Sequence, residues 1–124
     1  MGPNTDWGVA LTGNAVAFGI GGGSTGTNVT ITSSPVNDGE WRHIVATWEA
    51  SNRQMHIYLD GQPNVTGVSA SGEPRLAASP LIVARCSTAN RFYAGLLDDI
   101  QIYNRALSAN DVSFLFNAPG LTVQ

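Results

Sequence analysis

The stretch DGEWRHIVATWEASNRQMHIYLDGQP, residues 38–63, indicates two β-strands, the second of which is followed by a tight turn. In its second half, Met55 and Ile57 fall on one face of a strand and His56 and Tyr58 on the other, because successive side chains of a strand point to opposite sides. This strict alternation predicts a strand that is buried on one face. The pattern therefore favours an all-β protein.

The turn that follows this strand has its own sequence signature. Asp60-Gly61 suits a two-residue type I′ hairpin, since both turn positions need a positive φ. Pro63 comes just after it and suggests an edge strand or a strand start. The strand before the hairpin, predicted over Trp41–Trp48, is apolar on both faces, and Trp41 and Trp48 are expected to be structural. Such a strand is expected to be central and covered on both sides.

The rest of the chain repeats short apolar runs separated by turn-forming residues, which is typical of a β-sandwich or barrel. One short C-terminal helix is expected after Ser108, because Ser108 and Asp111 resemble a capping box and apolar residues then recur at helical spacing. The other predicted strands are Trp7–Leu11, Ala15–Ile20, Asn28–Thr32, Gln54–Leu59, Val65–Ser69, Leu81–Cys86 and Phe92–Tyr103.

Composition limits the classes of protein that fit. The 124 residues suffice for one domain, expected over 1–124, and the apolar fraction of 43% is ordinary for a globular chain. The net charge of -3 argues against nucleic acid as a partner. No apolar run approaches the roughly 20 residues of a membrane span. The first residues lack a signal-peptide pattern, so the chain is expected to be cytosolic or a piece of something longer.

Two further features have open interpretations. Cys86 is the only cysteine, so it forms no intrachain disulfide; a small buried side chain is favoured over a reactive thiol or an intermolecular bridge. Asn28 and Asn64 each begin an NVT sequon, which would accept glycan in a secreted eukaryotic protein. Ordinary strand and turn chemistry is the favoured interpretation for both asparagines.

Asp98 and Asp99 interrupt an apolar run that otherwise reads as a strand. Because adjacent side chains point to opposite faces, Asp98 falls on the same face as Ile100 and Ile102, where the core is expected. A buried carboxylate needs a partner. That partner is either a metal ion, backbone N–H groups, or an arginine such as Arg105.

Residues 38–63, followed by FYAGLLDDIQIYNRALSANDV at 92–112, resemble the laminin G-like jelly rolls of the concanavalin A-like superfamily. The resemblance is closest to the bacterial type found on secreted glycan-active enzymes and surface proteins, and pentraxins share a fainter version. It implies an antiparallel jelly roll and an extracellular or cell-surface location. It also implies that Asp98 helps to hold a structural calcium, together with backbone oxygens. No other cofactor is expected.

The resemblance exposes a departure at the N-terminal side. Family members usually begin with further strands, including an AWV-like core stretch, before the segment that starts here at Trp7. Without them the sandwich is expected to be incomplete, with uncovered core and open sheet edges. The chain either rebuilds the sandwich differently or completes it with a partner chain. The expected outcome is a partner, most simply in a homodimer with a large apolar interface.

The expected function is that of a non-catalytic binding module. Glycosidases of this fold carry paired carboxylates at alternate strand positions, whereas Asp98 and Asp99 are adjacent and point apart; no enzyme is therefore expected. The ligand is expected to be a carbohydrate or a protein surface, with Trp7, Tyr58 and Tyr93 as exposed aromatic side chains for binding. The alternative is a structural protein, a partial jelly roll that oligomerises and has no small-molecule ligand.

Overall fold

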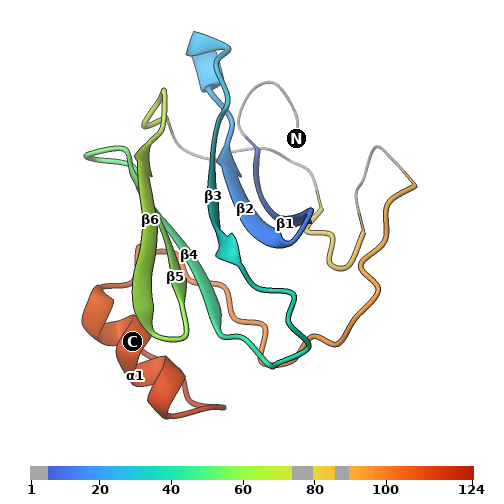
Figure 1. Cartoon of the computed structure of the whole chain (residues 1–124). Helices are drawn as coiled ribbons and strands as arrows, with labels where there is room; N and C mark the ends of the chain where they lie inside the picture. The colour runs from blue at the N-terminus through green and yellow to red at the C-terminus, as the bar shows by residue number, and fades with distance from the viewer. Residues whose placement is uncertain (1–5, 74–79, 86–89) are drawn as a thin grey trace.

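The computed structural model describes residues 6–73, 80–85 and 90–124. Within them, six strands form two three-stranded antiparallel sheets, and one helix follows (Figure 1). The predicted β-sandwich with a short C-terminal helix is confirmed. The elements are β1 (Trp7–Thr12), β2 (Ala15–Ile20), the short 3-10 helix η1 (Gly23–Thr25), β3 (Val29–Pro35), β4 (Ile44–Glu49), β5 (Gln54–Leu59), β6 (Gln62–Val68) and α1 (Ala109–Asn117).

Each sheet is a simple meander of strands in chain order. The first sheet has the order β1-β2-β3 and the second the order β4-β5-β6. Asp60 and Gly61, which join β5 to β6, have φ angles of 50° and 79°. Both are positive, so the predicted hairpin turn is confirmed. Pro63 lies near the start of β6, at the edge of its sheet, as predicted.

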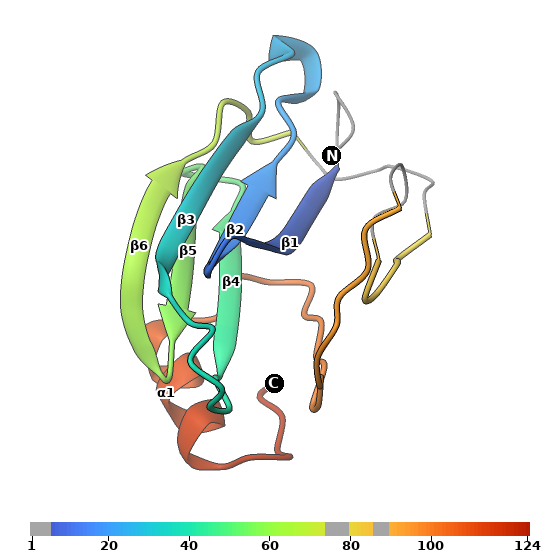
Figure 2. The same ribbon diagram turned by 45° about the vertical axis from the view of Figure 1, so that its right-hand side comes forward.

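The two sheets pack through β3, which lies over β5 and β6 (Figure 2). Gly67 of β6 permits the close approach, because a Cβ at this position would clash with Cγ2 of Ile31 on β3. Met55 and Ile57 of β5 are fully buried beneath this contact. The buried side chains of this core are Val16, Phe18, Ile20, Ile31, Val36, Met55 and Ile57.

Helix α1 covers the other side of the β4–β5–β6 sheet, where it forms a second core. The predicted capping box is present: Asp111 N–H donates to Ser108 Oγ at 3.1 Å, and Ser108 N–H donates to Asp111 Oδ2 at 2.9 Å. Arg105 also binds Asp111 Oδ2 at 2.8 Å, and these contacts hold the pKa of Asp111 at about 2. The buried residues of this second core are Tyr58, Leu107, Val112 and Leu115.

Two expectations about β4 were wrong. The strand begins at Ile44, and Trp41 lies outside it with 66% of its surface exposed, so Trp41 is not a core residue. Among the described residues β4 pairs only with β5 and is an edge strand. The strand is apolar on both faces because Trp48 packs against the first core and Val45 packs against the second.

The two strands predicted after β6 do not form within the described residues. Of Leu81–Cys86 and Phe92–Tyr103, only the isolated bridge between Arg85 and Phe92 appears, and Cys86 itself lies outside the described residues. A strand needs a neighbour for its ladder of hydrogen bonds, and no described segment pairs with 94–103.

The aspartate pair adds a local cause for this interruption. Asp98 Oδ1 accepts the N–H of Asp99 at 2.9 Å, and Asp99 has a φ of 50°. A side chain that binds nearby backbone competes with ladder hydrogen bonds, and a positive φ turns the chain out of the extended form. The run is therefore broken at the aspartates.

The tight turn at Gly61 gives a test of how the hairpin and α1 fit together. A Cβ at Gly61 would lie 2.9 Å from Cδ1 of Phe116, whereas Gly120, with a similar φ of 82°, has open space around it. Replacing either glycine by alanine should cost about 1–2 kcal/mol for the left-handed backbone. Gly61→Ala should cost about 1–3 kcal/mol more for overpacking. Equal losses of unfolding free energy in the two variants, measured in urea, would show that the Phe116 side chain moves aside without cost.

Candidate functional site

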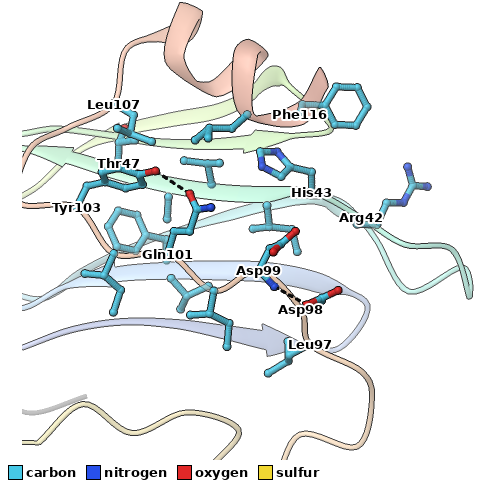
Figure 3. Close-up of a pocket in the computed structure, with 18 of the residues that line it drawn as sticks. Arg42, His43, Thr47, Leu97, Asp98, Asp99, Gln101, Tyr103, Leu107 and Phe116 are labelled. Atoms are coloured by element: carbon cyan, nitrogen blue, oxygen red, sulfur yellow. Dashed lines mark hydrogen bonds between the residues drawn. The ribbon is translucent and has the colours of Figure 1, made fainter. Parts of the chain in front are cut away.

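An open groove of about 1640 Å³ runs between β1, β4 and the segment 93–107 (Figure 3). Strands β1 and β4 are end strands of the two sheets and both line it. On β1 the apolar face formed by Trp7, Val9 and Leu11 is directed into this space and is about half exposed. The groove is thus the place where the sandwich stays open.

Exposed apolar side chains gather in this groove. Of the exposed large hydrophobic side chains in the described residues, all but Val68, Ile82, Phe92 and Phe114 line it. The most exposed of them is Leu96, at 75%. Scattered apolar side chains are normal on a protein surface, but a contiguous set of this kind marks a site of interaction.

The groove itself was not predicted as a binding site, although one signal in the sequence could have indicated it. Trp7, Val9 and Leu11 alternate with small or polar residues in the first strand, so they had to share one face. The sequence does not say whether that face is covered. The structure settles this, because all three side chains line the groove and are about half exposed.

Asp98 and Asp99 lie on the wall of the groove that segment 93–107 forms, and both are exposed. The expectation that Asp98 points into the core was wrong, because the segment is not a strand and presents Ile100 and Ile102 to the groove as well. Arg105 binds Asp111 and the carbonyl of Gln124, so it is not the partner of Asp98. The prediction that backbone N–H groups are the partner of Asp98 holds in part, because Asp98 Oδ1 accepts the N–H of Asp99.

The described residues do not by themselves make a calcium site. Calcium takes six to eight oxygen ligands, and no group of three or more acidic, histidine or cysteine side chains comes together within the described part of the chain. Calcium binding through Asp98 would need oxygens from elsewhere, and it stays a prediction.

His43 lies at one end of the groove, in a network of polar contacts. Its backbone N–H donates to Asp60 Oδ1 at 3.0 Å, and Arg42 binds Asp60 Oδ2 at 2.6 Å. Its ring lies 5.9 Å from that of Phe116, and its Nδ1 is buried with no hydrogen-bond partner among the described residues. Burial lowers the pKa of His43 below its usual value, and the Asp60 carboxylate opposes this only in part.

The three aromatic residues predicted to bind ligand do not lie together. Trp7 and Tyr93 both line the groove and are partly exposed. Tyr58 is only 6% exposed, and it packs in the second core beneath α1. Its expected exposure was therefore wrong: the polar-looking face of β5 is covered by the helix. Whether Trp7 and Tyr93 bind a ligand stays a prediction.

The sequon asparagines have structural contacts. Asn28 Oδ1 accepts the N–H of Gly22 at 3.0 Å, and Asn64 Oδ1 accepts the N–H of Ser34 at 2.9 Å. The second contact links β6 to β3 across the two sheets. These bonds agree with the interpretation of both residues as strand and turn chemistry.

Known proteins resemble this chain over most of its length. A profile of the laminin G type, described as the concanavalin A-like lectin/glucanases superfamily, matches residues 2–113. The chain belongs to this superfamily. The predicted resemblance is therefore confirmed. Laminin G-like domains are generally non-catalytic modules for binding and adhesion.

Two individual proteins are similar to this laminin G-like chain. The adhesion G-protein coupled receptor V1 of Danio rerio is 26% identical over 142 residues, which covers 97% of this chain and 2% of the receptor. A crystal structure of an S-layer domain-containing protein from Clostridium thermocellum has a TM-score of 0.55 and 23% identity, and the match covers 93% of this chain and 58% of that chain. At that identity the likeness shows the fold alone. No helix in the described part of this laminin G-like chain is long and apolar enough to cross a membrane.

The buried imidazole of this laminin G-like domain gives a test by pH. Because the pKa of His43 is below 6.5 in the folded state, the unfolded chain takes up the proton first as the pH falls. The free energy of unfolding should therefore decrease between about pH 7.5 and about pH 5. His43→Phe should reduce this decrease, and His56→Phe, the change at the other histidine, should leave it in place. Urea unfolding at both pH values measures the effect; an unchanged decrease in His43→Phe would contradict it.

Proposed function

We propose that this chain is a non-catalytic adhesion module that binds another polypeptide through its open groove. The observation that carries this proposal is the concentration of exposed apolar side chains along one groove. Burial of such surface is the main favourable term in protein association. The family supports the proposal, since its laminin G-like members are generally non-catalytic binding modules.

The chemistry of the groove favours a polypeptide over a small ligand. Its volume of about 1640 Å³ exceeds the roughly 300–1,000 Å³ of pockets that hold drug-sized molecules. Aliphatic side chains such as Leu96, Ile100 and Ile102 supply apolar area but few hydrogen bonds. A sugar has many hydroxyl groups, and these aliphatic side chains offer them no hydrogen bonds.

A cell-surface location goes with this function. The receptor that resembles the chain is named for adhesion, and the solved structure comes from a protein named for the S-layer. The chain spans only 2% of the receptor and 58% of the solved chain, so neither whole protein's activity transfers to it directly. We infer that the domain acts outside the cell or on its surface.

Carbohydrate binding is the second candidate, because Trp7 and Tyr93 present partly exposed rings to the groove. Aromatic rings provide a large apolar face with a polar edge, which suits the face of a sugar. Trp41 adds a third exposed ring at the groove. This candidate requires the three aromatic rings to bind the sugar with no contribution from the aliphatic side chains around them.

A glycan array separates the two candidates. A groove that binds polypeptide should give no glycan signal above that of a Trp7→Ala, Tyr93→Ala double variant. Tyr58→Phe is the control with an intact groove, because Tyr58 lies in the second core. A glycan signal that the double variant loses and the control keeps would overturn the polypeptide proposal in favour of carbohydrate.

Calcium binding is tested by thermal unfolding. If Asp98 helps to bind calcium, metal at a hundred times its Kd should stabilise the folded chain by about 2.7 kcal/mol, and Asp98→Ala should remove that gain. Asp38→Ala is the control, since this exposed carboxylate is paired with Arg42. Equal melting temperatures in excess calcium and in chelator would rule out the metal.

A further inference from the structure

Two open backbone edges meet at the groove. Strand β4 ends its sheet, and among the described residues its outer edge has no strand beside it. Opposite, residues 94–103 have no ladder partner among those residues. Unpaired N–H and C=O groups along an edge are a template for a further strand. The groove therefore offers both apolar area and backbone hydrogen bonds to an extended chain.

The size of the groove matches a strand. The six residues of β4 extend for about 20 Å. One strand with its side chains would thus be held along its length.

The chain itself carries a segment that fits. Within residues 96–103, Leu96, Ile100 and Ile102 recur at even positions and are 75%, 56% and 58% exposed. Residues 100–103 of the segment alternate as in a strand, the segment lacks a strand partner among the described residues, and it already forms one wall of the groove. Two copies placed face to face would bury both the segment and the groove of each chain at once.

We propose that the groove binds segment 96–103 of a second copy of this chain, so that two copies complete each other's sandwich in a twofold dimer. This inference rests on the proposed function and names the polypeptide that the groove takes. The arrangement is reciprocal, because each copy supplies one segment and one groove. It therefore closes at two chains and leaves neither groove open.

Charge sets one condition on this dimer. Asp98 and Asp99 lie within the entering segment. The groove that receives it is lined by Glu40, Glu49 and Asp60, and its two arginines, Arg42 and Arg105, are already paired with Asp60 and Asp111. Since opposed acids repel, and salt screens charges that solvent reaches, added salt should strengthen the dimer. A contact that depended on ion pairs would weaken instead.

The mass in solution tests the proposal. Light scattering at micromolar concentration should give a dimer for the natural chain. The Ile100→Asp, Ile102→Asp double variant should raise the dissociation constant by at least about tenfold. The matched control is Val68→Asp, Phe114→Asp, because both of these apolar residues are exposed and lie outside the groove. A monomer from the natural chain, or equal weakening by the control, would overturn the proposal.

A cross-linking experiment covers variants that fail to fold. In a Cys86→Ala background, Ile44→Cys on β4 in one copy and Ile102→Cys in another place a thiol on each side of the proposed contact. A flexible bis-maleimide added to the mixture should join the two copies. Val68→Cys mixed with Ile102→Cys is the control. Equal yields from the two mixtures would contradict the arrangement.

Binding of the dye ANS distinguishes failure of the dimer from failure of the proposed function. ANS reports exposed apolar surface. If the chain is a monomer that binds ANS, and Ile100→Asp reduces the signal, the groove is open. The dimer proposal then fails, and the proposed binding function stands. A monomer that does not bind ANS has closed its groove, and both proposals fail.

Discussion

The structure depends on the contact of β3 with β5 and β6, where Ile31 lies over Gly67 and above the buried Met55 and Ile57. Apolar burial here joins two sheets that share no backbone hydrogen bonds. The contact lies toward one side of the sandwich, whereas β1 and β4 belong to its other side. The same packing therefore closes the sandwich on the side of β3 and leaves it open on the side of β1 and β4.

The β4–β5–β6 sheet owes its stability to being covered twice. Its inner face meets the first core, and its outer face meets α1 through Tyr58, Val112 and Leu115. The hairpin at Gly61 and the capping box at Ser108 place Phe116 close to both His43 and the turn. This half of the molecule is complete, and it gives the open edge of β4 a rigid support.

A well-packed edge strand beside an incompletely covered apolar face suits the binding role that we propose. Two acids of the groove have local structural contacts: Asp98 binds its own backbone neighbour, and Asp60 holds Arg42 and His43. A strand that enters an open edge gains backbone bonds along its whole length. Ordering a new strand is easier when its template is already fixed.

The sequence by itself determined the local elements. Alternation in QMHIYL, the Asp60-Gly61 turn and the Ser108–Asp111 capping box each predicted a feature that the structure contains, because these signals act within a few residues. Tertiary structure decided the rest. Periodicity shows that Tyr58 and Trp7 lie on a face, but not whether α1 covers it, and an apolar run such as 92–103 becomes a strand only beside a neighbour. Burial and strand pairing depend on segments distant in the sequence, so the groove and the edge position of β4 appeared only in the fold.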